Sequence, residues 1–345
     1  NVDPQLNAET FYWEGEILFG HGEYDQAAAA YAKFSTTPGS YLSELHNDAD
    51  YARGYAHYKS EKYTDALSAF RAYLESPPDD DPARMRDAEL RAADCFFALK
   101  SFNQAADYYD RVLERDVEPL DYALFQRAMS AKLDQDLEGQ TARLEQLLEA
   151  YPNSRLVVEA LFQAGRTHIE LNQLADAESK FLSLIEQHSA TPRAKQALVE
   201  LCLVGVKLGQ DDKVLALWDR IRTEYGNDNV ASDAYNIVEP LLIERGLLSD
   251  LPAAVGLDGD AIEQRIFESA SFMALENRCA EAIPRLKEYL RQYPAGPHFS
   301  EAQFYLGNCL FDQDSTESAY DAYVAVLAMP ACEFTEASAL GAATI

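Results

Sequence analysis

The chain has 345 residues, of which 48% are hydrophobic and 25% charged, so it can bury a sizeable apolar core and is not a disordered tail. Its 58 acidic residues outnumber its 29 basic ones, giving a formal net charge of -29. This balance argues against binding to a phosphate backbone and docking on an anionic membrane, because both need clustered Lys and Arg. It is typical of a solvated surface, and it also suits basic partners or high salt.

The apolar segments indicate whether the chain inserts into a membrane, and its two ends indicate whether it is part of a longer protein. The longest apolar stretch, ALVELCLVGVKLG, is interrupted by Glu200 and Lys207 and is too short to span a bilayer, so no direct membrane insertion is expected. The chain begins without Met or a signal-like apolar segment, and it ends in FTEASALGAATI, which is typical of a helix that is just beginning. We therefore expect a fragment of a longer protein.

A ten-residue pattern recurs along the whole chain, with 31 to 39 residues between successive copies. The copy that contains Pro252 is degenerate. In chain order, starting at residues 22, 61, 100, 135, 172, 209, 246, 277 and 314, the copies are GEYDQAAAAY, EKYTDALSAF, KSFNQAADYY, QDLEGQTARL, NQLADAESKF, GQDDKVLALW, GLLSDLPAAV, NRCAEAIPRL and DSTESAYDAY.

Two positions of this pattern are especially regular. The tenth is apolar or aromatic in every copy, and the sixth is mostly small, as in Ala27 and Ala66. Two rows of small residues on successive amphipathic segments let two antiparallel helices approach closely, so each unit is predicted to be a helical hairpin. Turns such as TTPGS, YPNS and YPAGP close most units. The second small row precedes the sixth position by twelve residues, with Glu239 as its exception: Gly15, Gly54, Ala93, Ala128, Gly165, Cys202, Ala270 and Gly307.

These paired small positions, with aromatic residues around them and a Pro near the end of the unit, resemble the tetratricopeptide repeat. The resemblance covers about nine units and implies an all-α fold, an α-α superhelix (solenoid) truncated in the first helix of a tenth unit. Repeats 1 to 7 would span 1–258, and repeats 8 and 9 with the start of the tenth would span 259–345, in one continuous solenoid. Gln140 replaces the expected Ala in repeat 4. Repeat 7 has Pro252 in its second helix, so we expect it to be distorted, with a bend at about residue 258.

The long units and the YP endings most resemble tetratricopeptide proteins of the Gram-negative envelope. The similar types are the large repeat proteins of Bacteroidetes and proteins of outer-membrane assembly or associated with Tol-Pal. The resemblance implies a periplasmic or outer-membrane-associated location, and a cytoplasmic one stays open.

In the resembled family, the first helices of the repeats line a concave groove. The matching positions here form an aromatic floor edged by carboxylates, which would suit a protein or peptide with apolar anchors and basic flanks. The alternative is packing between repeats for the aromatic residues and the helix dipole for the acidic ones. The richest cluster is Tyr51, Tyr55, Tyr58, Asp94 and Phe97. The full predicted groove set is Tyr12, Phe19, Tyr51, Tyr55, Tyr58, Asp94, Phe97, Phe125, Phe162, Arg166 and Asn308.

The sequence carries no motif for catalysis. No HExxH, GxSxG, GxGxxG or Walker-type segment occurs, and the six histidines are scattered over different units, so neither an enzyme nor a cofactor is expected. The expected function is a non-catalytic protein-protein interaction scaffold within a larger cell-envelope protein or assembly. Two alternatives stay open: a regulatory or spacer segment of a larger multidomain enzyme or assembly, and a self-associating homo-oligomeric array.

Two further features concern metal ions and disulfides. DQDLEGQTARLE, from Asp134 to Glu145, nearly matches an EF-hand calcium loop, but the repeat register places it in the turn and second helix of repeat 4, and a helix excludes a loop wrapped around an ion. The five cysteines are far apart and include no CxxC pair, which predicts mostly buried free thiols. Cys279 and Cys309 could meet between neighbouring helices, but a disulfide there is the less favoured alternative.

Overall fold

A computed structural model describes residues 3–76, 81–245, 247, 255–256 and 259–345, and among these residues it contains helices and turns but no strand. The predicted all-α repeat fold is therefore confirmed. Contacts within the chain divide it into two compact units, Asn1–His188 and Ser189–Ile345.

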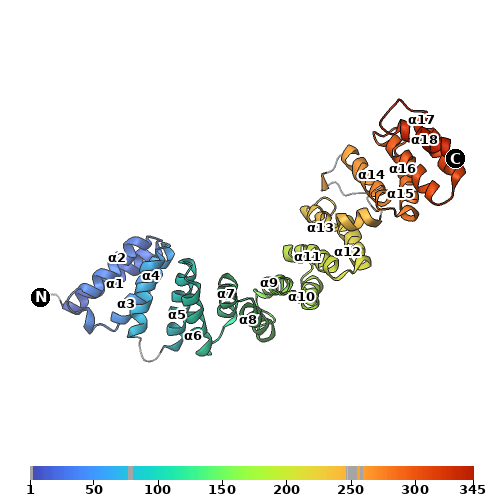
Figure 1. Cartoon of the computed structure of the whole chain (residues 1–345). Helices are drawn as coiled ribbons and strands as arrows, with labels where there is room; N and C mark the ends of the chain where they lie inside the picture. Colours follow the sequence, from blue (N-terminus) through green and yellow to red (C-terminus); the bar gives the residue numbers. More distant parts are fainter. Residues whose placement is uncertain (1–2, 77–80, 246, 248–254, 257–258) are drawn as a thin grey trace. The chain divides into compact units, whose positions relative to one another are not determined.

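In its described residues, the first unit consists of five helical hairpins and one short 3-10 helix, η1 (Ser40–Leu42) (Figure 1). Within this unit, helices that follow one another in the sequence pack together. The first helix of each hairpin carries an odd number, and we call the surface formed by these five helices the first-helix surface. The hairpins are α1 (Pro4–Gly20) with α2 (Tyr24–Thr36), α3 (His46–Lys59) with α4 (Tyr63–Glu75), α5 (Pro82–Ala98) with α6 (Phe102–Glu114), α7 (Asp121–Leu133) with α8 (Leu137–Ala150), and α9 (Val157–Glu170) with α10 (Leu174–Gln187).

The second unit is also built of helices that pack on their neighbours in the sequence. The second helix predicted for repeat 7, with Pro252, lies outside the described residues, as does most of the segment around residue 258. The predicted bend and the boundary at residue 258 stay predictions. The helices of this unit are α11 (Pro192–Leu208), α12 (Asp211–Glu224), α13 (Asn229–Arg245), α14 (Gly259–Leu275), α15 (Cys279–Gln292), α16 (Phe299–Asp312), α17 (Thr316–Leu327) and α18 (Thr335–Thr344).

The predicted rows of small residues lie where the two helices of a hairpin touch. A Cβ atom on Gly54 would lie 2.7 Å from ring atoms of Phe70, so the ring occupies the space that a larger residue would need. Gly165 faces Phe181 and Gly307 faces Tyr323 at 2.6 Å in the same manner. Every described residue of the sixth-position row has an exposed fraction of 0%, Gln140 included: Ala27, Ala66, Ala105, Gln140, Ala177, Val214, Ala282 and Ala319.

Gly54→Ala is expected to lower the free energy of unfolding of the first unit by about 1 to 3 kcal/mol, because the added methyl group must displace the buried Phe70 ring. Urea denaturation followed by circular dichroism measures the change. Gly20→Ala is the matched control on α1, since nothing lies within 4 Å of a Cβ atom there. Equal stability of the two variants would contradict this prediction, because it would show that the Phe70 ring moves aside at no cost in free energy.

The turns inside the hairpins share one backbone conformation. In all eight described copies, the first residue of the ten-residue pattern has a positive φ, between 56° and 80°. The next residue donates its N–H to the carbonyl five positions earlier, as from Lys62 to His57 at 2.9 Å. This is the six-to-one bond of a Schellman motif. Because only Gly22 and Gly209 among the eight are glycines, the backbone bond, more than the residue type, defines the turn.

The segment that resembles a calcium loop is helical, as the repeat register predicts. Helix α8 begins at Leu137, and Asp136 caps it by accepting a 2.8 Å hydrogen bond from the N–H of Gly139. The helix continues through Glu145, so these residues do not wrap around an ion. In the described part of the chain, no group of three His, Cys, Asp or Glu side chains is placed to hold a metal ion. Among the same residues, no helix has the length and apolarity that crossing a bilayer requires.

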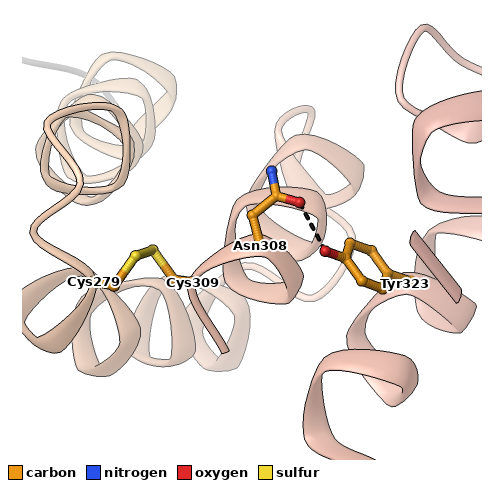
Figure 2. Close-up of a disulfide and its surroundings, with 4 residues drawn as sticks. All are labelled: Cys279, Asn308, Cys309 and Tyr323. Carbon is orange, nitrogen blue, oxygen red and sulfur yellow. Dashed lines mark hydrogen bonds between the residues drawn. A yellow bond between two sulfur atoms is a disulfide. The ribbon is translucent and has the colours of Figure 1, made fainter. Parts of the chain in front are cut away.

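Cys279 and Cys309 form a disulfide between α15 and α16 (Figure 2). The prediction of mostly free thiols is therefore wrong for this pair. Helix α15 packs on α16, and this packing brings two Cα atoms separated by 30 residues to 4.9 Å, within the usual range for a disulfide. Cys95 and Cys202 are free and buried, and burial raises the pKa of each thiol to about 12.

Candidate functional site

The helices α1, α3 and α5, with Tyr31 of α2, form a pocket of about 290 Å³ on the first-helix surface. Four residues of the predicted groove set line it together: Tyr12 and Phe19 from α1, and Tyr51 and Tyr55 from α3. We call this cavity the aromatic pocket. Its complete lining is Tyr12, Glu16, Phe19, Tyr31, Asp48, Tyr51, Ala52, Tyr55 and Arg84.

Helical spacing brings the rings of the aromatic pocket together. Tyr12 and Phe19 are seven residues apart on α1, and Tyr51 and Tyr55 are four apart on α3, so each pair lies on one face of its helix. The rings of Tyr51 and Tyr55 meet edge to face with 5.1 Å between centroids. Tyr12 is buried, with its ring centroid 5.6 Å from that of Tyr31. Packing within and between repeats thus orders the walls of the cavity.

The charged groups of the aromatic pocket are two carboxylates and one guanidinium. Glu16 accepts a 2.7 Å hydrogen bond from the Tyr31 hydroxyl. Asp48 forms a 2.6 Å salt bridge with Arg84 from the next repeat. Burial, together with the charges of Glu16 and Asp48, raises the pKa of Tyr12 to about 12. The Tyr12 hydroxyl therefore stays neutral near pH 7, and the lining carries one more negative than positive charge.

A polar network on α5 adjoins the aromatic pocket. Asp87 accepts hydrogen bonds from the hydroxyls of Tyr51, at 2.7 Å, and Tyr55. Arg91 lies 2.5 Å from Asp94 and 3.5 Å from Asp87. We call Asp87, Arg91 and Asp94 the α5 network. Through Tyr51 and Tyr55, it fixes the positions of two walls of the pocket.

Asp94 is a buried acceptor with several partners. Its Oδ1 accepts from the hydroxyls of Tyr109, at 2.7 Å, and Tyr122, at 3.1 Å, while Arg91 binds its Oδ2. Burial raises the pKa of the Asp94 carboxyl, although Arg91 and the two phenols act in the opposite direction. With 7% of its surface exposed, Asp94 joins repeats 3 and 4 and offers little access to a partner.

Comparisons with known proteins bear on the family of this helical array. One family model of the tetratricopeptide repeat matches residues 51–118 and 271–331, and a second matches residues 159–191. The chain therefore contains tetratricopeptide repeats. A search of curated proteins found no match.

Several solved structures are similar to this chain at low sequence identity. The C-terminal part of a repeat protein from Cytophaga hutchinsonii is 13% identical, with a TM-score of 0.48, over 86% of this chain and 99% of that one. A tetratricopeptide repeat protein from Parabacteroides merdae is 13% identical, with a TM-score of 0.44, over 86% and 97%. The Naa15/Naa10 complex bound to HypK-THB contains a chain that is 12% identical, with a TM-score of 0.50, over 93% of this chain and 53% of that one.

The other predicted groove residues of this tetratricopeptide repeat protein lie outside the aromatic pocket. The Tyr58 ring lies 5.9 Å from the guanidinium carbon of Arg91, beside the α5 network. Phe97 is half-buried against Phe102, with 5.5 Å between ring centroids. Asn308 belongs to the second unit, where it accepts a 2.8 Å hydrogen bond from the Tyr323 hydroxyl (Figure 2).

Three predicted residues lie further along the repeats of the first unit. Phe125 on α7 is half-buried, and Phe162 on α9 is buried with its ring 6.0 Å from that of Phe181. Arg166 is exposed on α9. None of these three lines the aromatic pocket. Their part in binding stays a prediction.

The sequence interpretation overlooked Arg84 and Arg91, although a signal for them is present. Arg84, Asp87, Arg91 and Asp94 are spaced by three, four and three residues, which places alternating charges on one face of a helix. The repeats also contain a signal for buried hydrogen bonds, which the sequence interpretation overlooked. A Tyr at the tenth pattern position occurs with a hydrogen-bond acceptor fifteen residues earlier, in the pairs Glu16 with Tyr31, Asp94 with Tyr109, and Asn308 with Tyr323.

Proposed function

We propose that this tetratricopeptide repeat protein is a non-catalytic scaffold that binds a segment of another protein on its first-helix surface. In the proposed complex, a basic side chain of the partner enters the aromatic pocket. The observation that carries the proposal is the pocket itself: aromatic rings from two repeats surround a space that also contains Glu16 and Asp48.

The chemistry of the pocket favours a cationic side chain. A guanidinium or ammonium group is attracted to aromatic faces and to carboxylates, and both are present here. A volume of about 290 Å³ is at the small end of ligand pockets and suits a single side chain better than a large small molecule. The net charge of -29 would also attract basic segments over longer range.

We further propose that the protein works in the cell envelope, within a larger protein or assembly. The disulfide between Cys279 and Cys309 supports this location, because disulfides persist in oxidising compartments such as the periplasm and are rare in the cytosol.

A random peptide library displayed on phage tests the binding site directly. We expect the selected peptides to carry Arg or Lys beside an apolar residue. The affinity of one selected synthetic peptide should fall by about tenfold on Glu16→Gln combined with Asp48→Asn, since about 1.4 kcal/mol of charge attraction is lost. Isothermal titration calorimetry measures this change. Both substitutions retain an oxygen that can accept the existing hydrogen bonds.

Glu14→Gln is the matched control, because Glu14 is exposed on the same helix and does not line the pocket. It should leave the affinity unchanged. Selected peptides without basic residues, or equal affinity for all variants, would contradict the proposal.

A further inference from the structure

A second pocket lies between the second helices of repeats 2 and 3. Its volume is about 230 Å³, and its lining combines residues of α4, α5 and α6. Three of these residues are arginines, although the whole chain has only 29 basic residues against 58 acidic ones. We call it the arginine pocket, and its lining is Arg71, Leu74, Glu75, Met85, Glu89, Tyr108, Arg111 and Arg115.

The arginine pocket is separate from the aromatic pocket. Helix α5 contributes Met85 and Glu89 to the former and Arg84 to the latter. At 100° per residue, Met85 and Glu89 point to the side of α5 opposite to Asp87 and Arg91 of the α5 network. A ligand in the arginine pocket therefore need not compete with a partner on the first-helix surface.

Two of the three guanidinium groups are held in place by the protein. Arg115 binds the buried Glu89 carboxylate through Nε and Nη2, the latter at 2.8 Å, which leaves its Nη1 outside this pair. The guanidinium carbon of Arg111 lies 4.5 Å from the ring centroid of Tyr108. Because these contacts already restrict both side chains, these two arginines lose little conformational entropy when a ligand binds.

The charges of the pocket are not balanced internally. Glu89 is occupied by Arg115, and in the described part of the chain neither Arg71 nor Arg111 forms a salt bridge. With three arginines against Glu75 and Glu89, the lining carries a net positive charge in a strongly acidic protein. An anion between the guanidinium groups would relieve their mutual repulsion.

We propose that the arginine pocket binds the oxyanion of a ligand, a phosphate or carboxylate group, between Arg71 and Arg111. The planar guanidinium fork matches both groups through paired N–H donors. Nη1 of Arg115 supplies a further donor. The ligand oxyanion comes either from a free phosphate compound or from the acidic side chains of a protein segment.

Nuclear magnetic resonance of the arginine Nε–H groups in the ¹⁵N-labelled protein tests this site. The probes are inorganic phosphate and a tetraglutamate peptide, each titrated at constant ionic strength. We expect saturable shifts for at least one probe. Arg71→Gln combined with Arg111→Gln should raise the Kd by about tenfold or more, as expected for the loss of charge-assisted hydrogen bonds. The probe with the lower Kd identifies the source of the oxyanion.

Arg220→Gln combined with Arg291→Gln is the control for a general loss of positive charge, because both arginines are exposed and paired with a Glu on their own helix. It should leave the Kd unchanged. Arg71 and Arg111 are themselves exposed, so their replacement should preserve the helical circular dichroism spectrum. Shifts that never saturate for either probe, or a Kd that is equal in both double variants, would overturn the proposal.

Discussion

Asp94→Ala is expected to lower the free energy of unfolding of the first unit by about 3 to 5 kcal/mol, the range for removing one partner of a buried charge pair. The substitution removes one carboxylate partner of the Arg91 guanidinium and leaves the Tyr109 hydroxyl without its acceptor. Tyr109 is fully buried, so water cannot replace the lost oxygen. Urea denaturation of the full chain, followed by circular dichroism, measures the change.

Two variants separate the role of Asp94 from general effects. Asp94→Asn keeps an oxygen for Tyr109 and should cost clearly less than Asp94→Ala. Asp107→Ala removes an exposed carboxylate from α6 and should change stability by less than about 0.5 kcal/mol. If Asp94→Ala were as stable as Asp107→Ala, Asp94 would be free to serve a partner, as the groove prediction has it.

Reduction of the disulfide between Cys279 and Cys309 is expected to lower the free energy of unfolding of the second unit by about 3 to 4 kcal/mol. This estimate is the chain entropy that a crosslink across 30 residues removes from the unfolded state. Urea denaturation with and without a phosphine reductant measures it. Hydrogen exchange should also become faster in α15 and α16, which the disulfide joins.

The doubly substituted protein, Cys279→Ala with Cys309→Ala, provides the control, because the reductant should leave its unfolding unchanged. Thiol titration of the unreduced, urea-unfolded wild type should find three free thiols, those of Cys95, Cys202 and Cys332. Five reactive thiols, together with no response to reductant, would contradict the disulfide.

The repeat fold was predictable from sequence because its determinants are local and repeated. Close helix packing requires small residues at fixed spacing, so Ala27, Ala66 and Ala105 occupy equivalent buried positions. Even Gln140, the weakest member of the row, is fully buried there and accepts a 2.8 Å hydrogen bond from Thr167. Nine imperfect copies of the pattern together predict a helical hairpin, whereas a single copy would not be sufficient.

The candidate site was only partly predictable, because it depends on contacts between repeats. Family positions placed Tyr51 and Tyr55 on the surface that contains the aromatic pocket, but their hydrogen bonds to Asp87 join α3 to α5 of the next repeat. Asp94 is likewise satisfied by its contacts with Tyr109 on α6 and Tyr122 on α7. The disulfide eluded the sequence interpretation for the same reason, since the spacing of Cys279 and Cys309 does not show which helix faces touch.

The same disulfide alters how the protein would respond to a pulling force. A stack of hairpins under tension releases its helices one after another from the loaded end. A load applied at the C-terminus would pass from Cys309 directly to Cys279, and the residues between them would bear no tension. Because 30 residues separate the two sulfurs, roughly 100 Å of extended chain would stay out of the force path until the bond is reduced. The redox state of the compartment would thereby set the length to which this end of the molecule can be drawn.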